Sequence, residues 1–132
     1  MKAHFLTPLD ARQVGPDQWK LLSDLTFYTE QFRGTCTARA GYCCDFASIP
    51  KVIGSLVPKY GGFNAAAVIH DAALTNDLYA DTGERQNWTR GYANDLFAEG
   101  LKATGVSWWR RQLMVTAVRL FADKQELIKT AA

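Results

Sequence analysis

Hydrophobic and polar positions change their spacing once along the chain, near residue 45. From Gln18, the stretch QWKLLSDLTFYT is rich in aromatic and β-forming residues, and QFRGTCTARAGYCCDF continues in the same style. Gly34 and Gly41 punctuate this region, which predicts an antiparallel hairpin or a small meander. The first 18 residues are predicted to be irregular, because they contain three residues that break regular structure: Pro8, Gly15 and Pro16.

Beyond residue 45 the apolar residues recur at helical spacing. In SIPKVIGSLVPK, Ser48 is placed to cap a helix and Pro58 to end it. A second helix is predicted over residues 64–76, and a third from residue 83 or 84 to residue 104. A last helix starts at Ser107 and carries apolar residues at near-helical spacing: Trp109, Leu113, Ala117 and Phe121.

These elements predict an α+β fold, with a small N-terminal antiparallel β-sheet or hairpin followed by a body of three to four helices. At 132 residues the chain has the size of one domain, so residues 1–132 are expected to form a single unit. Within it we expect an irregular N-terminal segment (1–18), a β-rich part (19–46) and a helical part (48–128).

Composition narrows the functional classes. The apolar fraction of 48% and the charged fraction of 21% are typical of a soluble globular protein. A net charge of +2 is too weak to indicate a nucleic-acid partner. No apolar run reaches the roughly 18 residues of a transmembrane helix, and MKAHFLTPLDARQ has no apolar core of a signal peptide. Cys36, Cys43 and Cys44 are expected to be reduced thiols, although a bridge from Cys36 to one of the pair stays open.

The stretch GFNAAAVIHDAALTND contains one of only two histidines in the chain, and Asp71 follows it directly. In one interpretation His70 is a core histidine that hydrogen-bonds a carboxylate. In the other, Asp95 on the following helix reaches His70 and fixes its tautomer. Asp71, turned about 100° around the helix, would then face a cation or a substrate, as in a general-base or metal site.

Asp45 and Ser48 fall where the β-rich part gives way to the helices. They are either a turn residue and a helix cap, or functional residues. Asp45 would then be either a further cation ligand or a contact for His70, and calcium, magnesium or zinc would suit the site. Ser48 would form a triad with His70 and Asp95, although no nucleophile-elbow motif surrounds it.

SWWRRQ makes the start of the last helix basic and aromatic. The favoured interpretation has Trp109 packed inward, with Arg110 and Arg111 in solvent. The alternative is a surface for phosphates or membrane headgroups.

The order of these motifs resembles a phage and prophage family of domains of unknown function. GYCCDFASIPKVIGSLVPKYGGFNAAAVIHDAAL, followed by NDLFAEGLKATGVSWWRRQLMVTAVRLF, carries the resemblance over roughly residues 19 to 121. Cys43 and Cys44 stand where the family has an aliphatic residue and a threonine. The resemblance implies five signature positions in this chain: Asp45, Ser48, His70, Asp71 and Asp95.

FNAAAVIHDAAL with the later NDLFAEGL is also similar to the paired helices of secreted calcium-dependent phospholipases. In those enzymes a histidine activates water, the next aspartate binds calcium, and an aspartate on the facing helix holds the histidine. The similarity implies these roles for His70, Asp71 and Asp95.

The sequence therefore suggests two main functions. The first is a phage-encoded hydrolase with a His/Asp site, acting on the bacterial envelope. The second is a non-enzymatic phage protein, such as a tail, baseplate or accessory component, in which the His/Asp network is structural and the partners are other phage proteins. The protein is expected in the host cytoplasm when it is synthesised, or in the virion. A factor that binds a host protein through residues 108–111 is a third possibility.

Overall fold

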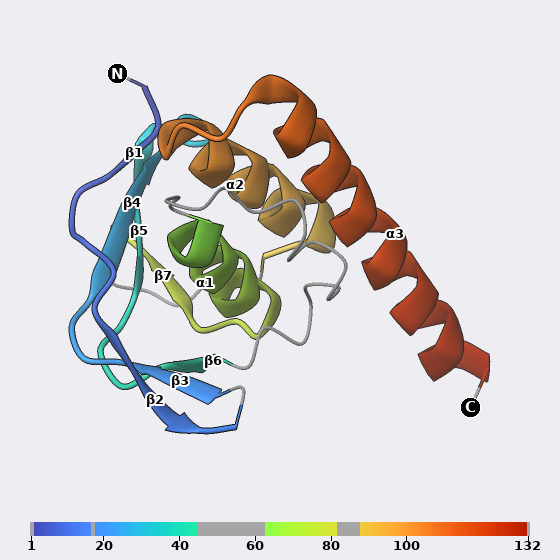
Figure 1. Cartoon of the computed structure of the whole chain (residues 1–132), viewed down its shortest axis with the longest axis horizontal. Coiled ribbons are helices and arrows are strands. Elements are labelled where there is room, and N and C mark those ends of the chain that lie inside the picture. The colour runs from blue at the N-terminus through green and yellow to red at the C-terminus, as the bar shows by residue number, and fades with distance from the viewer. Residues whose placement is uncertain (1, 17, 45–62, 82–87, 132) are drawn as a thin grey trace.

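A computed structural model describes residues 2–16, 18–44, 63–81 and 88–131, with side chains up to Leu120. The described elements, in chain order, are β1 (His4–Phe5), β2 (Ala11–Gly15), β3 (Gln18–Leu21), β4 (Leu25–Thr29), β5 (Gly34–Ala38), β6 (Cys43–Cys44), α1 (Phe63–Leu74), β7 (Leu78–Ala80), α2 (Arg90–Ala103) and α3 (Trp108–Ala131) (Figure 1).

The strands form two antiparallel sheets, one with the order β1-β4-β5-β7 and one with the order β2-β3-β6. The predicted fold, a single small N-terminal sheet or hairpin followed by helices, is therefore wrong. The chain is mixed α+β, but β1 and β2 lie within the segment predicted to be irregular, and β7 lies between helices. β1 and β7 pair with strands distant in the chain, as His4 does with Tyr28, and local sequence does not reveal such pairing. β2 instead forms a hairpin with the adjacent β3, in spite of Gly15 and Pro16 at the turn.

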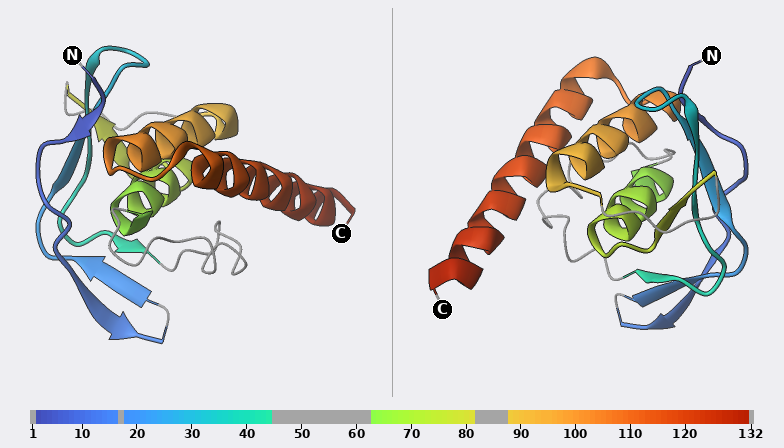
Figure 2. Two further views of the ribbon diagram at one scale, coloured as in Figure 1. Left: turned by 45° about the horizontal axis from the view of Figure 1, so that its top comes forward. Right: turned by 180° about the vertical axis from the view of Figure 1, so that it is seen from behind.

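Helix α1 lies at the centre of the molecule, between the sheets and α2 (Figures 1 and 2). Every residue from Ala65 to Ala73 is buried. Its alanines allow α2 to approach closely, because a Cβ atom added to Gly100 would lie 2.8 Å from the Cβ of Ala66. One hydrophobic core cluster joins α1 to the sheets, and a second joins it to α2 and α3.

Residues in the left-handed backbone conformation end α1 and α2. Asn76 has a φ of 60° after α1, and Gly105 has a φ of 85° after α2. At each end two backbone N–H groups bond back to the last turn, the pattern of a Schellman motif. The predicted third helix started at residue 83 or 84, but α2 starts at Arg90, because the hydroxyl of Thr89 caps it by accepting the N–H of Tyr92.

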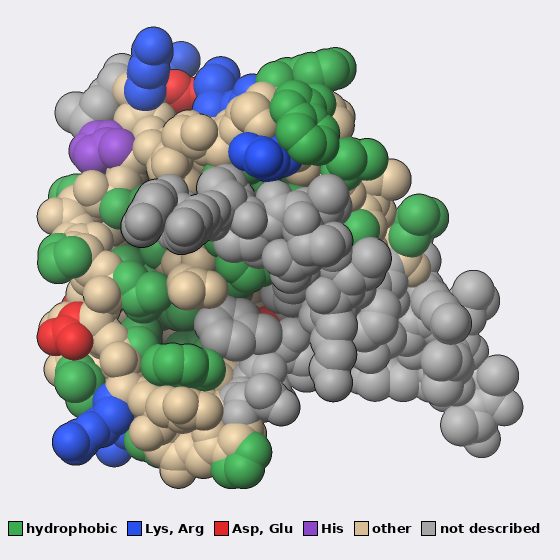
Figure 3. Space-filling model, viewed as in Figure 1, with side chains coloured by type: hydrophobic (Ala, Val, Ile, Leu, Met, Phe, Trp, Pro, Cys, Tyr) green, Lys and Arg blue, Asp and Glu red, His purple; other side chains and the backbone are tan. Residues whose placement is uncertain are grey.

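Helix α3 packs on the body with one side only (Figure 2). Met114 and Val118 are buried there, whereas Trp108 and Trp109 are 68% and 53% exposed. The predicted inward packing of Trp109 is therefore wrong, because the buried stripe of α3 lies on the opposite side of the helix. Figure 3 shows hydrophobic and basic side chains gathered over the start of α3. Within the part of the chain that the structure describes, no helix combines the length and apolar character needed to cross a membrane.

Candidate functional site

His70 points from α1 towards α2 and is completely buried. Its Nε2 atom lies 2.8 Å from Oδ1 of Asn94, and its ring packs against Phe97 with 5.3 Å between centroids. The predicted partner, Asp95, is not at this contact. Its side chain is 47% exposed and lies 3.6 Å from Arg119. The prediction that Asp95 orients His70 is wrong, because adjacent helical residues point about 100° apart and Asn94 is the residue that faces α1.

The environment of His70 keeps the imidazole neutral. Burial lowers its pKa below the ordinary value of 6.5, while the hydrogen bond with Asn94 and the negative charge of Asp71 oppose that shift. A carbonyl oxygen can only accept a hydrogen bond. Nε2 of His70 therefore carries the proton, and this N–H donates a hydrogen bond to Oδ1 of Asn94. In this neutral tautomer Nδ1 carries the lone pair and acts as an acceptor.

Asp71 points in a different direction from His70, towards the sheet that contains β6. It is 5% exposed, and the thiol of Cys44 donates a hydrogen bond to its Oδ2 atom over 2.9 Å. The two adjacent residues therefore serve different interfaces. His70 belongs to the contact between α1 and α2, whereas Asp71 belongs to the contact between α1 and β6.

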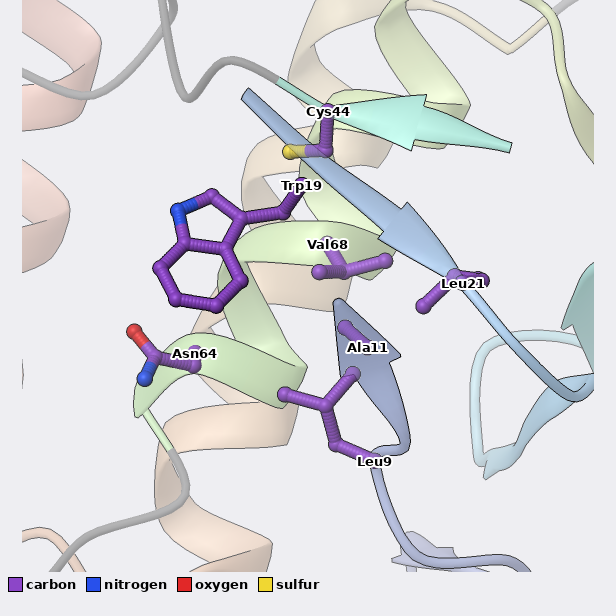
Figure 4. A pocket seen from close by; sticks show the side chains of 7 residues that line it. All are labelled: Leu9, Ala11, Trp19, Leu21, Cys44, Asn64 and Val68. Carbon is purple, nitrogen blue, oxygen red and sulfur yellow. The ribbon is translucent and has the colours of Figure 1, made fainter. Parts of the chain in front are cut away.

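A cavity of about 200 Å³ opens between α1 and the β2-β3-β6 sheet. The side chains that line it are shown in Figure 4: Leu9, Ala11, Trp19, Leu21, Cys44, Asn64 and Val68. Two residues that line this cavity, Cys44 and Val68, also lie close to Asp71. Cys44 donates a hydrogen bond to Asp71, and Val68 precedes Asp71 by about one helical turn. Asp71 thus lies behind one wall of an apolar pocket.

The comparison with protein families matches a model described as "Protein of unknown function (DUF1353)" over residues 19–118. The chain belongs to the DUF1353 family. No curated protein and no solved structure matches it. The resemblance to a family of domains of unknown function is thus confirmed, and Cys44, His70, Asp71 and Asn94 all lie within the matched part of this DUF1353 chain.

Two predicted site residues, Asp45 and Ser48, lie outside the described residues. The cation site remains a prediction for the same reason. Within residues 2–16, 18–44, 63–81 and 88–131, no three His, Cys, Asp or Glu side chains form a group that could hold a metal ion.

None of the three cysteines of this DUF1353 chain forms a disulfide, so the bridge that stayed open is not formed. Burial raises the pKa of Cys36 to about 12, with a smaller contribution from Glu99, which keeps its thiol protonated and unreactive. Cys44 is buried beside Asp71, and Cys43 is exposed because adjacent strand residues point to opposite faces.

Sequence reasoning missed Asn94 and the role of Cys44. A signal for Asn94 was present, since Asn94, Phe97 and Leu101 recur at i, i+3 and i+7 and are all buried. No comparable signal pointed to Cys44, whose contact with Asp71 joins a two-residue strand to a helix.

Proposed function

We propose that this DUF1353 protein is a phage-encoded hydrolase that cleaves an ester or amide of the bacterial envelope, with His70 as general base. The observation that supports this proposal is the state of His70. The imidazole is neutral, and Asn94 holds the protonated Nε2, so the basic lone pair is on Nδ1. A general base must be unprotonated at the working pH and held in one orientation, and His70 meets both requirements. Because its ring is completely buried, the proposal also requires α1 and α2 to separate locally before water and substrate reach Nδ1.

In the proposed reaction, His70 takes a proton from a water molecule whose oxygen attacks the carbonyl carbon. The bond to the leaving group then breaks, and His70 returns the proton to that group. Asn94 is a positioning residue, because its neutral amide orients the ring but cannot balance a positive imidazolium as a carboxylate would. Burial lowers the pKa of His70, and the negative charge of Asp71 opposes that shift, so Asp71 would stabilise the imidazolium when it forms.

The phage origin and the envelope substrate rest on the sequence resemblance described above. A divalent cation (calcium, magnesium or zinc) bound through Asp71 is part of the same proposal, by similarity to the phospholipase helices. It makes a separate prediction: the ion raises the melting temperature of the wild type more than that of Asp71→Asn. Equal shifts in the two proteins would remove the cation and leave His70 as an unassisted base.

Hydrolysis is tested with purified full-length protein on two substrates, phospholipid vesicles and bacterial peptidoglycan. Released fatty acid and released soluble fragments are measured for the wild type, His70→Asn and Asp71→Asn. Loss of the base is expected to reduce the rate by roughly 10²–10⁴-fold, and loss of the adjacent charge by less. Asp95→Asn is the matched control and keeps the wild-type rate, because Asp95 points away from His70.

The proposal fails if His70→Asn cleaves a substrate as fast as the wild type. It also fails if the wild type cleaves neither substrate. A rate that falls equally in Asp95→Asn would contradict the geometry of the site and the assignment of His70 with it.

One observation favours a second function, that of a non-enzymatic virion component. His70 is 0% exposed and hydrogen-bonded to the neighbouring helix, as in a buried polar pair that sets the register of two helices. This function predicts that mass spectrometry of purified phage particles finds the protein among the structural proteins. It also predicts that His70→Asn assembles normally as long as the protein stays folded. Absence from particles would exclude this function.

A further inference from the structure

The cavity between α1 and the β2-β3-β6 sheet is lined by both buried and exposed side chains. Leu21, Cys44 and Val68 are each about 3% exposed or less. Trp19 and Asn64 are exposed, and their side chains lie on the same side of the cavity in Figure 4, which we call its open end. A molecule that enters beside the indole ring would therefore meet a largely buried lining.

The lining selects for a neutral, mainly apolar ligand. Residues of the described chain that line the cavity include no Lys, Arg, Asp or Glu. The thiol of Cys44 donates a hydrogen bond to Asp71, so the sulfur presents a polarisable, weakly polar surface to the cavity. A charged group would lose its hydration here without a counterion among the described residues of the wall, which is a large cost.

Size and polarity narrow the ligand further. The cavity volume is about 200 Å³, and an apolar protein cavity of about 150 Å³ is known to hold a benzene ring. The amide of Asn64 at the open end can donate or accept a hydrogen bond, so one polar substituent fits there.

We propose that the cavity lined by Leu9, Ala11, Trp19, Leu21, Cys44, Asn64 and Val68 binds a small neutral molecule or substrate group. It consists of one apolar ring or branched chain, with a single hydrogen-bonding substituent at the Asn64 end. The site does not depend on hydrolysis by His70, whose ring lies on another face of α1.

The test follows methyl signals by ¹H–¹³C NMR while p-cresol, toluene or benzoate is added to the full-length protein. p-Cresol and toluene are expected to shift the methyl signals of Leu9, Leu21 and Val68 in a saturable manner. Leu101 and Val118, in the core cluster with α3, are the internal controls and stay unchanged. Benzoate is expected to shift none of these signals, because its charge finds no partner.

Three variants locate the site. Ala11→Leu fills the cavity from its wall and abolishes the shifts, and Leu9→Phe takes its place if that variant does not fold. Asn64→Leu weakens the binding of p-cresol by about 2- to 10-fold through the lost hydrogen bond and leaves the binding of toluene unchanged. His70→Asn keeps both ligands, so a failure of hydrolysis and a failure of this pocket are distinguishable.

The proposal is overturned if toluene and p-cresol leave the three cavity methyl groups unshifted up to their solubility limits. It is also overturned if the shifts persist in the filled variant, or if the control methyl groups shift equally. Binding of benzoate as tight as that of toluene would refute the neutral ligand class.

Discussion

Acidification should destabilise this protein through His70 in a way that one substitution removes. The folded state lowers the pKa of His70 below its ordinary value of 6.5, chiefly by burial. Below pH 6.5 the unfolded chain therefore binds a proton that the folded protein does not. Stability is complete above that pH and falls as the pH drops towards the folded-state pKa.

The magnitude follows from the burial of a single imidazole. One proton bound only by the unfolded state changes the free energy of unfolding by about 1.36 kcal/mol per pH unit. Between pH 7.5 and 5.5, the unfolded chain binds this extra proton only in the pH unit below 6.5, so His70 changes the free energy of unfolding by at most about 1.4 kcal/mol. For a chain of 132 residues this corresponds to a fall in melting temperature of roughly 4 °C.

The assay is urea unfolding of wild type and His70→Gln at pH 7.5, 6.5 and 5.5. Glutamine can still donate a hydrogen bond to Asn94 but has no proton to gain, so its curve reports all the other titratable groups, His4 included. We expect the difference between the two proteins to change by about 1 kcal/mol across this range, in favour of the variant at low pH. Parallel pH profiles, or an NMR titration of His70 centred at or above pH 6.5, would refute the reasoning.

Two further predictions concern the contact between α1 and α2. Gly100→Ala should destabilise the protein by about 1–3 kcal/mol, because the new Cβ atom would overlap that of Ala66. Gly91→Ala is the control and should be neutral or stabilising, because a Cβ atom at Gly91 meets open space. Chemical denaturation measures the free energy of unfolding of both variants. Equal effects of the two substitutions would contradict the close approach. Asn94→Asp places a carboxylate beside Nε2 and should raise the pKa of His70, which an NMR titration measures; an unchanged or lower value would contradict the assigned contact.

The helical part of the fold is the part that local sequence patterns predicted most closely. The expected helix over residues 64–76 corresponds to α1, and α3 begins directly after Ser107 as expected. The predicted side-chain cap is wrong, because Oγ of Ser107 is buried without a hydrogen-bond partner among the described residues. The correct features depend on residues close together in the chain: apolar residues at helical spacing, and Asn or Gly where the helix ends.

The pairing of the strands and the contacts between site residues depend on long-range packing, which local patterns do not reveal. The pairing of β1 with β4 and the contact of Cys44 with Asp71 each join parts of the chain far apart in sequence. The finding that Asn94 contacts His70, in place of the predicted Asp95, also follows from tertiary packing. A one-residue step turns a helical side chain by about 100°, and the rotation of α2 against α1 is set by packing, including the close approach of Gly100 to Ala66.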